Sequence, residues 1–360
     1  MNANPESLAP FLHNIADVQP ADDGSLRLPR VPVTLLAGLN EAVRRRAYAP
    51  AGAELRFRQP RGPVTIRLRR MPDSNEAFHP PAAVLAGVFH GDFQSGWYAL
   101  PEGDTTLAIP PFAGDRETLA KARYRYSPDL VRVVLPVFPE IRLVALEGEL
   151  EPARAEDAPS RRYLAYGSSI THGAYTPLGT ATYPAVVARL LGTDLLNLGF
   201  GNGARLEPDM ARWIVSRKDW DFASLEMGIN VLGDVAWFRE LVKGFLPVFA
   251  ADPAKRPVFC LDLLPCRGEI KGEDPAMFEG YRAAIRDELA ALGVPHLHRL
   301  SYADGLARHA DLADDLLHPG AHAFEDIGRH LAAQMRPVLA ASGASKPGTN
   351  PVTGRSRARG

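Results

Sequence analysis

The sequence of 360 residues has little cysteine, almost no net charge and no long apolar run. Its two cysteines, Cys260 and Cys266, cannot form a framework of several disulfides, and their spacing does not fit a zinc site. Lysine and arginine number 41 against 42 acidic residues, which gives a formal net charge of −1 and no reason to expect binding to nucleic acid or to a membrane surface. No apolar run reaches the length of a transmembrane helix, and the first residues lack the basic and apolar regions of a signal peptide, so we expect a cytoplasmic protein.

Two regions of different pattern follow one another, as the length suggests. From about residue 26 to residue 151, short apolar runs alternate with turn residues at spacings typical of an antiparallel sandwich. Residues 151–160 form a charged connector rich in proline and alanine. We therefore predict a β-sandwich domain over 1–155, a second domain over 161–341 and a disordered tail over 342–360.

Arginines alternate with apolar residues in the first region, as in Val64–Arg69. The simplest interpretation is that these arginines form the solvated face of each strand. A basic binding face is the alternative, although the acidic count matches the basic one.

The second region alternates short apolar runs with amphipathic stretches. The predicted strands are Tyr163–Tyr166, Leu195–Leu198, Phe222–Met227, Val258–Leu263 and Val294–Leu297, and the predicted helices lie near Tyr183–Leu191, Pro208–Val215, Trp237–Phe249, Pro275–Leu292 and Phe324–Met335. This alternation predicts a parallel, doubly wound sheet, whose functional site lies beyond the carboxyl ends of the strands.

Ser169 lies where the first of these strands breaks, after Gly167. At a corner between a strand and a helix, a serine hydroxyl is exposed and its N–H points the same way as the first free donors of the helix. A nucleophile of acyl transfer needs both features. Gly-Ser-Ser turns also occur in ordinary loops, so this stretch alone leaves a plain turn as the alternative.

Two further stretches support the catalytic interpretation. Asp315 and His318 are three residues apart, so the aspartate can hold the imidazole in the tautomer that faces a serine. Asn230 follows a predicted strand end, where its amide could be a donor to an oxyanion.

The sequence resembles the SGNH (GDSL-type) hydrolases over about half of the chain. The matching stretches are Tyr166–Ile170, Asn197–Gly203, Gly228–Asn230 and Asp315–His318, in the order of the family's blocks I, II, III and V. The resemblance implies a flavodoxin-like doubly wound sheet, preceded here by an all-β, jelly-roll-like sandwich as in some carbohydrate esterases of that superfamily.

The resemblance also assigns roles to residues. It makes Ser169 the nucleophile, His318 the general base and then acid, and Asp315 the residue that orients His318. The oxyanion donors would be the Ser169 N–H, a backbone N–H of Gly201 or Asn202, and the Asn230 side chain.

The sequence departs from the family pattern at two places. Ser168 stands where the family has an aspartate, so the role of that aspartate is not filled by the same residue type. Gly201-Asn202 stands where a Gly-Gly or Ser-Gly pair is usual, which leaves the backbone donor open between these two residues; asparagine tolerates a left-handed backbone better than most residues.

We therefore expect a serine esterase that hydrolyses small acyl esters, acetyl esters of carbohydrates foremost, without a cofactor or a metal. A lipase or thioesterase for longer acyl chains is the alternative within the superfamily, and a non-catalytic glycan-binding module is the alternative outside it. The expected partner is a small-molecule or oligosaccharide ester, with no nucleic acid and no membrane; a homo-oligomer formed through the sandwich edges is also compatible with the sequence.

Two residues are candidates for substrate binding. His172, three residues after Ser169, could line the cleft, and an ordinary residue of the first helical turn is the alternative. Trp97 lies in a polar, Gly-rich stretch and could stack on a sugar, whereas a hairpin with its aromatic side chains folded under is the alternative.

Two rival motifs are weaker. Gly199–Ala204 satisfies a dinucleotide fingerprint, but it follows the second strand and leaves Ser169 and His318 unexplained. His318 and His322 have a helical metal-ligand spacing, but Pro319 breaks the helix that would align them, so His322 is expected to be an ordinary surface residue.

Overall fold

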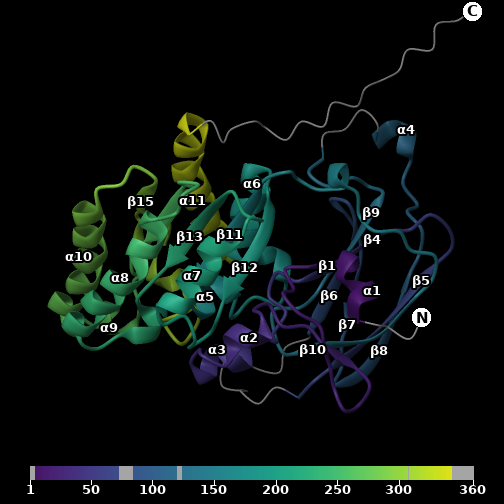
Figure 1. The fold of residues 1–360 in the computed structure, drawn as a ribbon, viewed down its shortest axis with the longest axis horizontal. Coiled ribbons are helices and arrows are strands. Elements are labelled where there is room, and N and C mark those ends of the chain that lie inside the picture. Colours follow the sequence, from purple (N-terminus) through teal and green to yellow (C-terminus); the bar gives the residue numbers. More distant parts are fainter. Residues whose placement is uncertain (1–4, 73–83, 120–123, 307, 343–360) are drawn as a thin grey trace, which may run out of the picture.

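A computed structural model describes residues 5–72, 84–119, 124–306 and 308–342 of the chain. Figure 1 shows a part rich in β-strands beside a part in which helices surround a further sheet. The predicted tail lies outside the described residues, except for Ser342. Within the described ranges, no helix is both long and apolar enough to cross a bilayer.

The β-rich part consists of two five-stranded antiparallel sheets, with the strand orders β1-β4-β9-β6-β7 and β2-β3-β10-β5-β8. Along β5, Val64, Ile66 and Leu68 are fully buried and the intervening Arg67 is exposed, because successive side chains of a strand point to opposite faces. Buried side chains of both sheets share one core, which confirms the predicted sandwich. The strands are β1 (Leu12–His13), β2 (Gln19–Pro20), β3 (Leu26–Arg27), β4 (Glu54–Arg58), β5 (Val64–Arg70), β6 (Leu85–His90), β7 (Phe93–Ala99), β8 (Gly103–Ile109), β9 (Leu130–Val134) and β10 (Ile141–Glu147).

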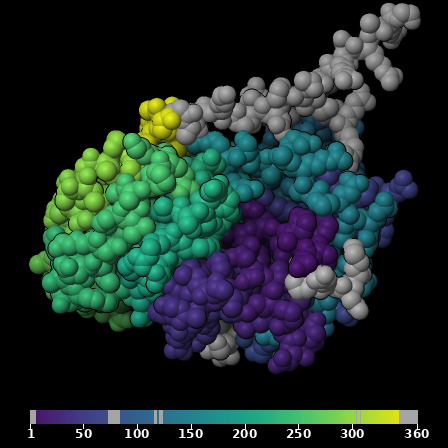
Figure 2. All heavy atoms as spheres, in the orientation of Figure 1, coloured from purple at the N-terminus to yellow at the C-terminus, as the bar shows by residue number. Residues whose placement is uncertain are grey.

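Helices interrupt the β-rich part, where the sequence pattern predicts only strands. They are α1 (Pro5–Leu8), η1 (Ala9–Phe11), α2 (Val33–Leu36), α3 (Glu41–Arg46), α4 (Arg116–Leu119) and η3 (Ala155–Asp157). Asn40 caps α3 by accepting a hydrogen bond from the Val43 N–H, and the fully buried Val43 packs into the core of the other part. Figure 2 shows the indigo atoms of this helical segment against the teal and green atoms of that part.

The second part contains a parallel five-stranded sheet in the order β12-β11-β13-β14-β15, which is the flavodoxin-like order that the resemblance implies. Its strands are β11 (Arg162–Gly167), β12 (Asp194–Gly199), β13 (Phe222–Glu226), β14 (Val258–Leu261) and β15 (Leu297–Leu300). The helices and turns are α5 (Ser169–His172), η4 (Gly179–Ala181), α6 (Tyr183–Leu191), α7 (Pro208–Ser216), η5 (Ile229–Val231), α8 (Val235–Ala250), α9 (Arg267–Ile270), α10 (Pro275–Leu292), η6 (Ala303–Gly305), η7 (His309–Asp311) and α11 (Ala321–Ala341). The predicted α/β fold is confirmed, and α10 has the predicted bounds.

The open edge of the parallel sheet, strand β12, lies against the β-rich part. On β12, the carbonyl of every second residue points away from the sheet at its free edge. These carbonyls, of Leu195, Asn197 and Gly199, accept hydrogen bonds from His13, Asn14 and Arg30. These side chains therefore occupy acceptors that would otherwise be left unpaired at a sheet edge.

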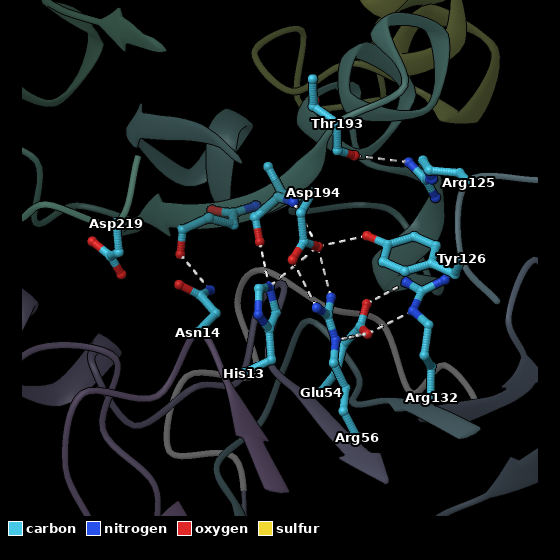
Figure 3. Close-up of polar contacts among 12 residues, drawn as sticks. His13, Asn14, Glu54, Arg56, Arg125, Tyr126, Arg132, Thr193, Asp194 and Asp219 are labelled. Carbon is cyan, nitrogen blue, oxygen red and sulfur yellow. Dashed lines mark hydrogen bonds and ion pairs between the residues drawn. The ribbon is translucent and has the colours of Figure 1, made fainter. Parts of the chain in front are cut away.

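A buried network of charges joins the two parts at the start of β12 (Figure 3). Arg56 donates two hydrogen bonds of 2.7 Å to Asp194, and Arg56 and Arg132 both pair with Glu54. Burial alone would raise the pKa of the Asp194 carboxyl, but the charge of Arg56 together with the hydrogen bonds from Arg56 and Tyr126 holds that pKa well below its usual range. The interpretation of the strand arginines as a solvated face therefore holds for Arg67 and is wrong for Arg56 and Arg132.

Candidate active site

Ser169 is the first residue of α5, directly beyond the carboxyl end of β11. Ser168 caps this helix, because its Oγ accepts a hydrogen bond of 3.1 Å from the Ile170 N–H. The helix ends at Gly173, whose φ of 106° lies in the left-handed region. The turn is therefore fixed at both ends, and Ser168 has a structural role at the position where the family has an aspartate.

Close packing under this turn requires a glycine at position 167. A Cβ at Gly167 would lie 2.2 Å from Thr171 Oγ1 and 2.5 Å from Glu226 Oε2. The buried Glu226 accepts hydrogen bonds of 2.6 Å from the Ser168 N–H and 3.0 Å from the Thr171 hydroxyl, and its burial raises the pKa of its carboxyl. These contacts anchor the backbone on which Ser169 sits.

The structure brings Ser169, His318 and Asp315 together. Ser169 Oγ lies 2.7 Å from His318 Nε2, and His318 Nδ1 lies 2.5 Å from Asp315 Oδ2. The second carboxylate oxygen, Oδ1, accepts hydrogen bonds of 3.0 Å from the backbone N–H groups of Leu317 and His318. Burial alone would raise the pKa of Asp315, but the bonds from His318 outweigh it and lower that pKa, so the aspartate is ionised and can hold the Nδ1–H tautomer of His318.

Tyr175, which the sequence analysis did not single out, covers His318. The two rings stack with their centroids 5.2 Å apart and their planes 25° from parallel. Tyr175 has a φ of 69°, which is a strained conformation for a residue with a bulky side chain. The only sequence signal for this role is its position two residues after Gly173. That signal is insufficient, because the sequence does not show that this turn lies over His318.

The proposed oxyanion donors lie on turns around Ser169. A Cβ placed on Gly201 would lie 3.4 Å from the Cβ of Ser169, so the backbone of Gly201 borders the serine directly. Asn202 follows with a left-handed φ of 59°. The Asn230 amide donates weak hydrogen bonds of 3.3 and 3.4 Å to the carbonyls of Phe200 and Ala204, which holds the amide against the same turn.

His172 does not line an open cleft. Its ring is fully buried, stacks on Phe138 at 3.9 Å between centroids, and its Nε2 lies 3.1 Å from the carbonyl oxygen of Val137. We expected His172 to line the cleft and bind substrate. It is buried instead, because Phe138, from the β-rich part, covers this helix turn. Trp97 packs edge-on against Phe89 within the hairpin of β6 and β7.

The rival motifs have structural roles. A Cβ on Gly199 would lie 2.1 Å from the backbone nitrogen of His172, so this glycine permits the close approach of α5 to β12. His318 is bonded on its two ring nitrogens to Ser169 and Asp315, which does not leave it available as a partner of His322 for a metal. In the part of the chain that the structure describes, no group of three or more His, Cys, Asp or Glu side chains could hold a metal ion.

Comparisons with known proteins agree with this architecture. Residues 165–325 match the sequence model of the GDSL-like Lipase/Acylhydrolase family. Among solved structures, a salicylyl-acyltransferase from a tetracycline biosynthetic pathway is similar with a TM-score of 0.74 and 22% identity over 93% of this chain and 95% of that chain. A search among curated proteins finds no matching relative.

Two further structures share the fold. A GDSL-like lipase from Bacteroides ovatus has a TM-score of 0.68 and 16% identity over 87% of this chain and 91% of that one. A family two carbohydrate esterase from Clostridium thermocellum, solved with cellohexaose, has a TM-score of 0.55 and 14% identity over 80% of this chain and 92% of that one. At these identities the comparison shows a common fold that includes the β-rich part.

Proposed function

We propose that this protein, whose residues 165–325 match the GDSL-like Lipase/Acylhydrolase family, is a carboxylic ester hydrolase that cleaves small acyl esters of carbohydrates, acetyl esters foremost. The observation that carries the proposal is the chain of short contacts from Ser169 Oγ through His318 to Asp315. That chain has the geometry needed to remove the proton from the serine and to stabilise the imidazolium that forms.

In the proposed reaction, Ser169 Oγ attacks the carbonyl carbon of the ester while His318 Nε2 takes the hydroxyl proton. The negative oxygen of the tetrahedral intermediate is bound by the Ser169 N–H, by a backbone N–H of Gly201 or Asn202, and by the Asn230 amide. His318 then gives its proton to the departing alcohol, and the acyl group stays on Ser169. A water molecule, deprotonated by His318, attacks the acyl-enzyme; His318 then returns that proton to Ser169 Oγ as the acid is released.

The carbohydrate preference is supported by the resemblance of the two-part architecture to the family two carbohydrate esterase, and by an exposed aromatic ring. Trp237 is 50% exposed at the start of α8, a few residues beyond Asn230, and an exposed indole face can stack on a sugar ring. Trp237 is therefore a better candidate for sugar stacking than Trp97, which packs on Phe89.

An acyltransferase is a second candidate, favoured by the similarity to the salicylyl-acyltransferase structure. Both reactions pass through the same acyl-enzyme, and they differ only in whether water or another alcohol accepts the acyl group.

The test is the turnover of p-nitrophenyl acetate by the wild type, Ser169→Ala and Asn230→Ala. We expect Ser169→Ala to lose both the burst and the turnover, and Asn230→Ala to lose about 10²–10³ in kcat, because one oxyanion donor is removed. Equal turnover by the wild type and Ser169→Ala would contradict the proposal and would favour a glycan-binding module.

The choice of substrate is tested separately. Release of acetate from acetylated oligosaccharides should exceed the hydrolysis of esters with long acyl chains; the reverse preference would favour a lipase or thioesterase. Addition of an alcohol acceptor distinguishes the second candidate, because an acyltransferase then forms a new ester instead of free acid.

A further inference from the structure

The β-rich part places a guanidinium beside the proposed nucleophile. Arg46, the last residue of α3, is 7% exposed. A Cβ placed on Gly201 would lie 3.9 Å from Arg46 Nε and 3.4 Å from the Cβ of Ser169. Arg46 and Ser169 therefore border the same space next to Gly201, although 122 residues separate them in sequence, as their numbers show.

Two sets of contacts hold Arg46 in place. Its guanidinium lies over the ring of Phe138, 4.9 Å from the centroid, and the ring of Phe138 stacks in turn on the buried His172. The carbonyl of Arg46 accepts a hydrogen bond of 3.0 Å from the buried Arg30.

Arg30 extends this support to the parallel sheet. Its guanidinium also donates to the carbonyls of Ala49, Asn197 and Gly199 at 2.7 to 2.9 Å, so it ties the end of α3 to the end of β12. Burial lowers the pKa of Arg30 to about 9, which still leaves it protonated at neutral pH. The position of Arg46 is therefore set before any substrate arrives, which reduces the entropy that binding must overcome.

A guanidinium has five N–H donors in a planar fork that matches the two oxygens of a carboxylate. The proposed oxyanion already has three donors: the Ser169 N–H, one backbone N–H from either Gly201 or Asn202, and the Asn230 amide. Because Arg46 Nε lies on the Gly201 side of Ser169, an ester bound at Ser169 would bring the groups next to its carbonyl close to this guanidinium.

We propose that Arg46 is a specificity-determining residue that binds a carboxylate carried by the substrate next to the scissile ester. This inference rests on the proposed function, because it takes Ser169 as the nucleophile. The carboxylate can belong to the acyl group, as in a succinyl ester, or to the alcohol, as in an acetylated uronic acid.

Two pairs of substrates separate these sources. For the acyl side, p-nitrophenyl succinate, with a free carboxylate, is compared with p-nitrophenyl pentanoate. For the alcohol side, acetylated glucuronic acid is compared with acetylated glucose by release of acetate. The enzymes are the wild type, Arg46→Gln, Arg46→Lys and Arg45→Gln, the last being a matched control that removes an exposed charge from the same helix.

We expect the wild type to prefer the anionic member of one pair. Arg46→Gln should lose about 10- to 100-fold in kcat/KM on that member, through a higher KM, because a charge-assisted hydrogen bond to the bound substrate is removed. Arg46→Lys should retain part of the preference, and Arg45→Gln should retain all of it. The neutral esters should stay within about threefold for every variant, which also shows that Arg46→Gln folds.

Three results would overturn the inference. The wild type could show no preference in either pair, Arg45→Gln could lose as much as Arg46→Gln, or Arg46→Gln could lose kcat equally on charged and neutral esters, which would make Arg46 a donor to the oxyanion. If Arg46→Gln fails to fold, the wild-type preference and the Arg46→Lys variant decide. A dead Ser169→Ala variant with an unchanged Arg46→Gln preference would refute this inference alone, whereas an active Ser169→Ala variant would refute the proposed function.

Discussion

We expect His13 to make the folded protein less stable as the pH falls from 6.5 toward 4. His13 is buried where the two parts meet, and its Nε2 lies 2.6 Å from the carbonyl oxygen of Leu195, to which it can donate when the ring is neutral. Burial, followed by the charge of Arg56, lowers the pKa of His13 to about 4 in the folded protein.

The sign and the size follow from proton linkage. Between pH 6.5 and 4 the unfolded chain binds a proton on His13 and the folded protein does not, so acidification favours unfolding. A pKa difference of this size predicts a loss of about 2 kcal/mol in the free energy of unfolding between pH 7.5 and pH 5. The pKa values of Glu54 and Asp194 are lowered instead, so these carboxylates lose their contribution only below their unfolded pKa values, which lie near 4.

Urea unfolding at pH 7.5 and pH 5 measures this difference for the wild type and for His13→Asn. The variant loses the hydrogen bond to Leu195 at both pH values, but its free energy of unfolding should change by about 2 kcal/mol less between them. His309→Asn, at an exposed histidine, is the control and should keep the wild-type pH dependence. If His13→Asn keeps the full wild-type dependence, the burial of a neutral imidazole at this contact is not the cause.

Three other predictions follow from single contacts. Asp194→Asn should lower the free energy of unfolding by about 3–5 kcal/mol, since it leaves the buried Arg56 without its bidentate partner, and a urea series showing less than about 1 kcal/mol would contradict this. Gly167→Ala should reduce both stability and esterase activity because its Cβ would collide with Thr171 and Glu226, whereas Gly96→Ala, where a Cβ meets nothing within 4 Å, should be close to neutral in the same assays. Tyr175→Leu should lower kcat/KM on p-nitrophenyl acetate by about 10-fold, because the ring that stacks on His318 and limits its movement is lost. Tyr175→Phe keeps the stacked ring and should lose less, so equal losses in the two variants would count against the stacking.

Much of the fold could be predicted from local pattern. Apolar-rich runs of four to six residues mark β11, β12, β13 and β14 because both faces of this sheet are covered, and the amphipathic stretches give helices such as α6 and α10 with their observed bounds. The strand predicted at Val294–Leu297 lies instead at Leu297–Leu300. Helices α2 and α3 were not predicted. The Asn40 cap and the burial of Val43 stabilise α3, and the burial of Leu36 stabilises α2; the core that buries both side chains is formed by residues far along the chain, which no short window contains.

The candidate site divides in the same way. Ser169, Asn230 and His318 could be found because each follows a strand end or a turn whose residues are readable in sequence, and the carboxyl ends of parallel strands meet at one edge. The placement of His172 could not be found, since its burial depends on Phe138 from the β-rich part. Arg56 and Arg132 were misplaced on the solvated face because the alternation of a strand shows which side chains share a face, and not what covers that face.

Strand β12 explains why the β-rich part lies close to the candidate active site. As the edge of a parallel sheet, β12 needs partners for its outward carbonyls, and His13, Asn14 and Arg30 provide them. The same strand ends just before the turn of Gly201, beside Ser169. Arg30, which donates a hydrogen bond to the last carbonyl of β12, also donates one to the carbonyl of Arg46 and so holds the end of α3. A contact required to cover a sheet edge thus places a charged group close to Ser169, and we expect a change in Arg30 to act on stability and, through Arg46, on substrate choice.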